Sequence, residues 1–331
     1  MNFTKPVTDR AADFDYLGER STPIPDRGCS QGIVTMRSMD HTVCDEEKTA
    51  TEHTEENDCA EGVFDNPLLP FCLDDLTCNE RGTLEHDLTL AARIQQTLLP
   101  SPDFSPTGWD VRYHYAPAGV FGGDYCDLVE SKAGLLFLFG DVCGKGVAAS
   151  MLMSHLHATF RSLADGNRPL DVMVEAANRN FVGRAVGGQF ATLVAGLAAA
   201  DGSVDFVNAG HLPLLHLHKG TIRCESATSV PLGLVAGARF PSRRFLLDPG
   251  DTLFVSTDGV TEARNSGGEE YGIERLKKMV AEHPLATPSQ LISECLADLA
   301  DFTAGTERTD DLALLAIQRT GRALCEVGYE S

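Results

Sequence analysis

The sequence predicts an α+β fold in which antiparallel β-sheets are covered by helices. Short runs rich in Val, Leu and Phe follow one another directly, separated by segments that contain Gly, Pro and Asp, which is typical of strands joined by tight turns. The helical patterns arrive in pairs and do not alternate with single strands. Because regular alternation would indicate a parallel sheet, the pattern favours a sandwich of antiparallel sheets and helices.

The expected strands are short. They cover 111–115, 134–139, 190–198, 204–208, 214–218, 244–247 and 252–256, with a last strand at 311–318. Helical patterns cover about 145–164 and 169–184, and about 271–283 and 287–302 before the last strand. The β-rich pattern starts after Pro100, so the predicted folded domain occupies residues 101–320.

A separate helix is predicted at 83–100, immediately before this domain. One face of it recurs at three- and four-residue steps and a proline ends the run: Leu84, Leu88, Ala91, Ala92, Gln95, Leu98 and Pro100. Periodicity alone leaves two interpretations open. The helix packs on the domain as an ordinary element, or it couples an N-terminal input or a second subunit to the domain.

Residues 1–80 differ from the rest of the chain in charge and pattern. They hold 6 Lys/Arg against 18 Asp/Glu, a net charge of −12 out of −21 for the whole chain. The stretch 45–58 is polar and acidic, and such a segment cannot bury enough surface to offset the entropy lost on ordering. We predict a mostly disordered region, with the apolar patch 64–76 as a candidate short docking element.

Charge, apolar runs and cysteine spacing exclude several classes of function. The net charge of −21 argues against a nucleic-acid partner, whose phosphates it would repel. No apolar run reaches the roughly 18 residues of a membrane span, and no apolar stretch follows the first residues as in a secretory signal. The 10 cysteines are scattered, and none has the two-residue spacing of a zinc knuckle or redox pair. We expect a cytoplasmic protein with reduced thiols and no membrane association.

Acidic residues mark the ends of several predicted strands. They are Asp124, Asp141, Asp258 and the adjacent pair Asp310 and Asp311, each beside small or flexible residues. A single Asp-Gly pair is more often a turn than a ligand. Four such sites at strand ends favour convergence above the sheets, where the carboxylates would repel one another unless cations neutralised them. Hard oxygen ligands suit Mg²⁺ or Mn²⁺, and two such ions can activate a nucleophile and polarise a phosphoryl group.

The glycine-rich segment 140–146 resembles a phosphate-binding loop only faintly. It ends in Gly-Lys-Gly and opens a predicted helix, but it lacks the spacing of the nucleotide-binding motif, and Val147 follows the last glycine. A nucleotide-binding regulator is therefore disfavoured. The helix terminus would still attract an anionic group through its dipole.

The histidines do not form an evident metal set in the sequence. His155 and His157 lie two apart on a predicted helix and face different directions, whereas His216 and His218 share one face of a strand. No third ligand is adjacent to either pair, so these four are predicted to be structural or exposed. His211 lies in a turn between strands, where it either hydrogen-bonds locally or borders the site.

The motifs in their order resemble those of the SpoIIE/RsbU-type branch of the bacterial PPM serine/threonine phosphatases. The matching segments are Gly122–Asp127, Gly140–Gly146, Asn208–His211, Ser256–Glu262 and Asp310–Asp311, and residues 92–100 are similar to the helix that precedes that catalytic domain. The resemblance covers about 90–320. It implies a PPM-type αββα sandwich, that is, two antiparallel β-sheets flanked by helices, at 101–320, and a regulatory helix at 83–100 that acts through dimerisation.

The resemblance also implies a site with two Mn²⁺ or Mg²⁺ ions. Asp141 would bridge both metals, the carbonyl of Val142 would ligate one of them, and Asp124, Asp258 and Asp310 would complete the ligand set. A metal-bridged hydroxide would then attack the phosphorus directly. The sequence departs from the family at Cys143, where Ser is common, and at Ala313, where Thr is frequent. The choice of Asp310 over Asp311 rests on the motif alone.

The function that the resemblance implies is hydrolysis of a phosphoserine or phosphothreonine on a regulatory protein. In this branch the substrate would be a STAS-domain anti-sigma-factor antagonist in a partner-switching pathway. The alternative is a catalytically silent pseudo-phosphatase that only binds such a partner. The presence of Asp at all four carboxylate positions argues against the alternative.

Overall fold

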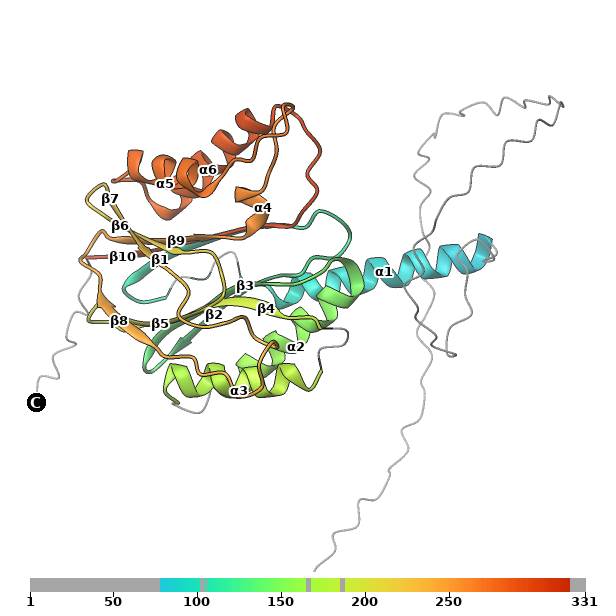
Figure 1. Ribbon diagram of the computed structural model, residues 1–331, viewed down its shortest axis with the longest axis horizontal. Coiled ribbons are helices and arrows are strands. Elements are labelled where there is room, and N and C mark those ends of the chain that lie inside the picture. Colours follow the sequence, from blue (N-terminus) through green and yellow to red (C-terminus); the bar gives the residue numbers. More distant parts are fainter. Residues whose placement is uncertain (1–77, 102–103, 105, 165–167, 185–187, 322–331) are drawn as a thin grey trace, which may run out of the picture. The chain divides into compact units, whose positions relative to one another are not determined.

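The computed structural model describes residues 78–101, 104, 106–164, 168–184 and 188–321. Most of the region 1–80 that the sequence predicts to be disordered lies outside the described residues. The described chain forms two five-stranded sheets stacked face to face, with helices on both outer faces (Figure 1). The predicted α+β sandwich is confirmed, and its layers are those of an αββα fold.

All strand pairs within the two sheets are antiparallel. The first sheet has the order β1-β10-β9-β6-β7, formed by Trp109–Ala116, Leu312–Arg319, Thr252–Ser256, Leu214–His218 and Thr221–Glu225. The second sheet has the order β2-β3-β4-β5-β8, formed by Asp124–Ser131, Gly134–Val142, Ala191–Ala198, Ser203–Ala209 and Arg243–Leu246.

Helices cover the outer face of each sheet (Figure 1). The first sheet is covered by α5 (Ile273–Glu282) and α6 (Pro288–Thr303), and the second by α2 (Gly146–Ala164) and α3 (Leu170–Val182). The short α4 (Asp258–Thr261) follows β9, and α1 (Cys78–Leu98) precedes the sandwich. No helix in the described residues is both long and apolar enough to cross a bilayer.

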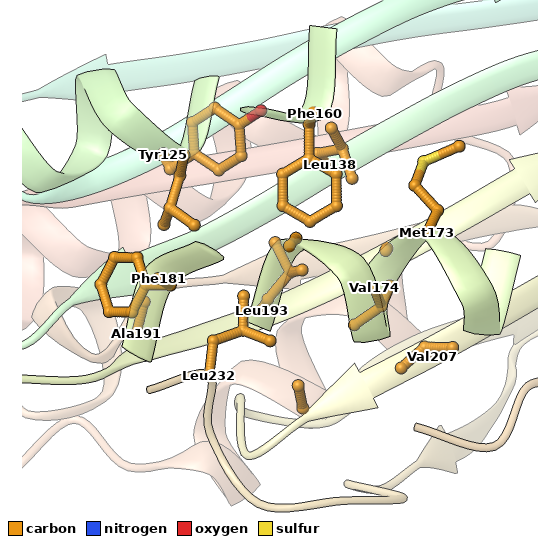
Figure 2. Packing of buried hydrophobic residues seen from close by; sticks show 14 of the residues in the cluster. Tyr125, Leu138, Phe160, Met173, Val174, Phe181, Ala191, Leu193, Val207 and Leu232 are labelled. Carbon is orange, nitrogen blue, oxygen red and sulfur yellow. The ribbon is translucent and has the colours of Figure 1, made fainter. Parts of the chain in front are cut away.

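Three apolar layers hold the sandwich together, one between the sheets and one under each pair of helices. The central strand β3 shows why both of its faces are apolar. Phe137 and Phe139 enter the layer between the sheets, whereas Leu136 and Leu138 enter the layer under α2 and α3. Figure 2 shows this second layer, in which Leu138 and Leu193 meet Phe160 and Val174.

The structure corrects several predicted element boundaries. The first helix begins at Cys78 and not at Thr83, whose hydroxyl donates to the carbonyl of Asn79 one turn earlier. Strands β2 and β7 and helix α4 were not predicted. β2 does not show a run of Val, Leu and Phe because it contains the buried Asp127, which forms a bidentate ion pair with Arg161 of α2 at 2.6 and 2.8 Å.

Candidate metal centre

The second sheet brings two of the predicted carboxylates together. Asp124 begins β2 and Asp141 lies near the end of β3, and the antiparallel register makes them direct cross-strand partners. The prediction had ended the second of these strands at 139, but pairing with β2 extends it through Val142. Burial raises the pKa of Asp124 well above its ordinary value, and the charges of Asp141 and Asp311 raise it further.

The first sheet supplies Asp258 from the end of β9, where the strand gives way to α4. The preceding Thr257 joins the two sheets, because its hydroxyl donates to Oδ2 of Asp124 at 2.9 Å and accepts from the amide of Ala313 at 3.0 Å. Burial raises the pKa of Asp258, and the nearby charge of Asp310 adds to the effect. Thr257 lies within a motif that the sequence analysis singled out, but its bridging role depends on a contact between sheets that no local pattern reveals.

The adjacent pair Asp310 and Asp311 divides into two roles. The carboxylate of Asp311 accepts the amide of Ala118 at 2.8 Å and that of Gly123 at 2.7 Å, so both of its oxygens hold the loop before β2. Asp310 instead pairs with the ammonium of Lys145 at 2.9 Å, and its side chain is 40% exposed. The other oxygen of Asp310, Oδ1, accepts the amide of Asp311 at 3.0 Å, so the two carboxylates differ in exposure and not in whether they have partners.

Close backbone approaches at the site require glycine at two positions. A Cβ on Gly123 would lie 2.8 Å from the carbonyl oxygen of Val142 and 3.2 Å from Oδ1 of Asp141. A Cβ on Gly259 would overlap the carbonyl oxygen of Asp311. The glycines let neighbouring carboxylate-bearing segments approach closely within each sheet, Gly123 beside β3 and Gly259 beside the segment that leads into β10.

The centre accumulates negative charge in a partly buried place. Burial raises the pKa of Asp141 to about 7, with Asp258 and Asp310 as the next causes. Among the described residues, no three of these aspartates bring one oxygen each within 4.8 Å of one another. Without a cation such mutual repulsion opposes closer approach, and the ammonium of Lys145 offsets only part of the charge. Carboxylates plus a backbone carbonyl form a donor set that fits Mg²⁺ or Mn²⁺.

Three further side chains border the centre. The buried hydroxyl of Tyr115 has no hydrogen-bond partner among the described residues, and burial together with Asp311 raises its pKa. His211 is 7% exposed and its Nδ1 lies 2.7 Å from the hydroxyl of Thr192, the cross-strand partner of Asp141. Burial lowers the pKa of His211 to about 4, so the ring is neutral at physiological pH. His211 also hydrogen-bonds locally as predicted, because its amide donates to Oδ1 of Asn208 at 2.9 Å.

Helix α1 also reaches the centre. The side chain of Gln95 is 6% exposed, donates to the carbonyl of Gly122 at 2.6 Å and accepts the amide of the same residue at 3.3 Å. Gly122 lies two residues before Asp124. Periodicity placed Gln95 on the apolar face of the predicted helix, but it gave no sign of a polar partner.

Comparison with known proteins agrees with this geometry. The family model described as stage II sporulation protein E (SpoIIE) matches residues 131–320. The chain is 27% identical over 270 residues to protein IcfG of Synechocystis, where the match covers 72% of this chain and 42% of IcfG. It is 26% identical over 245 residues to the phosphoserine phosphatase RsbU of Bacillus subtilis, with 71% of each protein covered.

Among solved structures, the RsbU and RsbW domains of a Mycobacterium tuberculosis protein superpose with a TM-score of 0.57 at 28% identity. This match covers 66% of the chain and 62% of the mycobacterial one. The matched family model spans more than half of the sequence and includes Asp141, Asp258 and Asp310. The chain belongs to the SpoIIE family, the branch of PPM-type phosphatases that includes RsbU.

Proposed function

We propose that this chain is a metal-dependent phosphatase that hydrolyses phosphoserine or phosphothreonine on a regulatory protein. The observation that carries the proposal is the convergence of Asp124 and Asp141 from one sheet with Asp258 and Asp310 from the other. The name of RsbU, a phosphoserine phosphatase, supports the same reaction class.

In this proposal Asp141 and the carbonyl of Val142 hold the ions jointly with Asp124, Asp258 and Asp310. Asp310 is preferred to Asp311 because its side chain is 40% exposed, whereas Asp311 is 7% exposed and holds the loop before β2 with both oxygens. Two bound Mn²⁺ or Mg²⁺ ions would supply an activated water and polarise the phosphoryl group.

The chain's own residues then position this apparatus. Thr257 fixes one oxygen of Asp124, and Asp311 holds the loop at Ala118 and Gly123. The ammonium of Lys145, whose side chain is 60% exposed, places a positive charge at the edge of the centre where a phosphate dianion would arrive. The neutral ring of His211 supports the backbone of β3 and β4 through Thr192 and adds no charge.

A pseudo-phosphatase that only binds its partner remains the second candidate function. It is less well supported because every predicted ligand position keeps its oxygen donor and the supporting hydrogen bonds are intact. The STAS-type regulatory substrate follows from the family alone, and the net charge of −21 argues against a nucleic-acid partner.

We further propose that α1 regulates the centre and pairs with α1 of a second copy. The contact of Gln95 with Gly122 connects the helix to the segment that carries Asp124. Leu90 and Ile94 on the same helix are 50% and 57% exposed, which suits an apolar contact between two copies.

The reaction class is tested by hydrolysis of a generic aryl phosphate by the full chain, with Mn²⁺ and with EDTA. Wild type is compared with Asp141→Asn and with a surface control, Asp201→Asn, which lies in an exposed turn. We expect turnover that needs Mn²⁺, survives in the control and is lost in Asp141→Asn. Turnover that persists in EDTA or in Asp141→Asn would contradict the proposal. Metal binding by calorimetry without any turnover would favour the pseudo-phosphatase.

A further inference from the structure

A second group of metal-ligating side chains lies at the opposite end of β9 from the acidic centre. His216 and His218 belong to β6, and Asp251 directly precedes β9. Their sequence separation explains why no third ligand was recognised for the two histidines. The two strands are neighbours in the first sheet, so the fold places a third group, Asp251, beside the two histidines.

The two histidines face the interior of the sandwich. Leu215 and Leu217 of β6 enter the layer under α5 and α6, so the alternate residues face the second sheet. The ring of His216 is 3% exposed and stacks on Phe245 of β8, with ring centroids 5.5 Å apart. This end of the sandwich therefore buries polar side chains beside the apolar layer between the two sheets.

The ligand atoms of this group are already close. Nε2 of His216 lies 3.0 Å from Oδ2 of Asp251, and Nδ1 of His218 lies 2.8 Å from Oδ1 of the same carboxylate. One ligand atom from each residue falls within 4.8 Å of the others, and no other group of three or more His, Cys, Asp or Glu in the described ranges meets this criterion. A tetrahedral ion with bonds of about 2.0–2.1 Å separates neighbouring ligand atoms by roughly 3.3 Å, so each contact need open by only a few tenths of an ångström.

The surroundings complete the features of a metal site. The backbone amide of Asp248 donates to Oδ2 of Asp251 at 2.9 Å and so orients the carboxylate. Metal ligands in proteins are commonly oriented by such hydrogen bonds. The carboxylate of Asp248 lies 4.0 Å from Nδ1 of His218 and is 55% exposed. It is placed to serve as a fourth ligand or to lead an ion in from solvent, beside a His218 side chain that is 29% exposed.

We infer that His216, His218 and Asp251 form a second metal site, distinct from the acidic centre, that takes Zn²⁺ or a similar transition-metal ion. Two imidazoles and one carboxylate suit zinc, whereas the all-oxygen donors of the acidic centre suit Mg²⁺ or Mn²⁺. The ion would replace the two contacts between the imidazoles and the carboxylate. It would tie β6 to the turn that leads from β8 of one sheet to β9 of the other, and it would stabilise the folded state by mass action.

The test is zinc retention by the full chain during dialysis against a fixed low concentration of free Zn²⁺ in excess Mg²⁺, followed by elemental analysis. Four proteins are compared: wild type, His218→Gln, Asp258→Asn and the control His283→Gln, in which a half-buried histidine of another surface is changed. Because the side chain of His218 is partly exposed, His218→Gln is the ligand change least disruptive to folding.

We expect one more zinc ion per chain in three of the proteins, wild type, Asp258→Asn and His283→Gln, than in His218→Gln. The affinity of His218→Gln for zinc at this site should fall at least about tenfold. Zinc should raise the melting temperature of the same three proteins and not that of His218→Gln. Co²⁺ bound to the wild type should show the visible absorption of a tetrahedral site, and Zn²⁺ should displace it. Equal zinc content in wild type and His218→Gln would overturn the inference and leave the three residues as a hydrogen-bonded network. Loss of the zinc in Asp258→Asn would instead place the ion in the acidic centre and would also overturn it.

Discussion

Two aspartates flank the same strand, β9, and their surroundings shift their pKa values in opposite directions. At Asp251, which precedes the strand, burial alone would raise the pKa, but hydrogen bonds from His216, the Asp248 amide and His218 outweigh it and lower the pKa. At Asp258, which follows the strand, burial raises the pKa and the charge of Asp310 adds to it. The strand is five residues long, so the two carboxylates lie roughly 20 Å apart.

The comparison shows what each end of the sandwich lacks. The fold provides hydrogen-bond partners for both oxygens of the Asp251 carboxylate, so this end satisfies its buried carboxylate without an ion. The acidic centre holds more carboxylates than positive charges and hydrogen-bond donors. The balancing positive charge must therefore come from ions in solution. A buried charge without a partner usually marks a functional site, and here it marks the end that carries the family motifs.

The largest expected difference between the two ends appears in a matched pair of substitutions, Asp258→Asn and Asp251→Asn. Asp258→Asn removes a ligand of the proposed ions, so kcat/KM with Mn²⁺ should fall at least about 10³-fold. The melting temperature in EDTA should stay the same or rise, because one repelling charge is gone. Asp251→Asn should lower the free energy of unfolding by about 1–3 kcal/mol, since its donors lose a charged acceptor.

Both variants are to be assayed for turnover and for unfolding, with turnover measured well below the melting temperature. If Asp258→Asn were less stable than wild type in EDTA, protein groups would already neutralise the charge of Asp258 in the folded state. The contrast between the two aspartates would then fail.

The neighbouring aspartates that precede β10, Asp310 and Asp311, offer a second contrast within the acidic end. Asp311→Asn keeps one acceptor oxygen but loses the other, so the loop at Ala118 and Gly123 should loosen and the free energy of unfolding should fall by about 1–3 kcal/mol. Asp310→Asn should leave stability unchanged in EDTA and weaken Mn²⁺ binding about 10- to 100-fold. Urea unfolding and calorimetric titration with Mn²⁺ separate the two effects. The reverse pattern would make Asp311 the ligand.

The dependence of stability on pH distinguishes the ends without mutation. The folded state of the metal-free chain holds Asp124, Asp141 and Asp258 with raised pKa values, so it binds more protons than the unfolded state between their folded and unfolded values. In EDTA the melting temperature should therefore rise as the pH falls from about 8 to about 5. Asp251 has a lowered pKa in the folded state, so ionised Asp251 stabilises the fold. This stabilisation is lost as the pH falls below the ordinary carboxylate range and through the lowered folded pKa.

Saturating Mg²⁺ should flatten this rise, because bound ions keep the carboxylates ionised. Thermal melts in EDTA and in Mg²⁺ across the same pH range provide the measurement. A melting temperature in EDTA that falls from pH 8 to pH 5 would show that repulsion among the carboxylates of the acidic end does not destabilise the metal-free fold.

The sequence predicted the layers and the carboxylates of the acidic end because both depend on local signals. Runs rich in Leu, Val and Phe identified strands such as β6 and β9 with their bounds, and the position after a predicted strand identified Asp258. It did not predict Thr257 as a bridge or Asp251 as a partner of two histidines. These contacts join residues that are 133 and 35 positions apart, and the antiparallel register of separate strands decides them. β2 was missed for a related reason, since its buried Asp127 is neutralised by an arginine of α2.

The smallest expected effect concerns the link between α1 and the acidic end. Gln95→Met keeps the side-chain volume but cannot bond to either backbone group of Gly122, and leaving both groups unsatisfied should cost about 1–2 kcal/mol. Because Gly122 precedes the segment that carries Asp124, turnover with Mn²⁺ should fall a few-fold, while zinc retention at the histidine end stays unchanged. The matched control is Gln96→Met, whose side chain is exposed on the same helix. Equal turnover in the two variants would mean that α1 touches the centre without controlling it, and the regulatory role of this helix would then have to rest on its contact with a second copy alone.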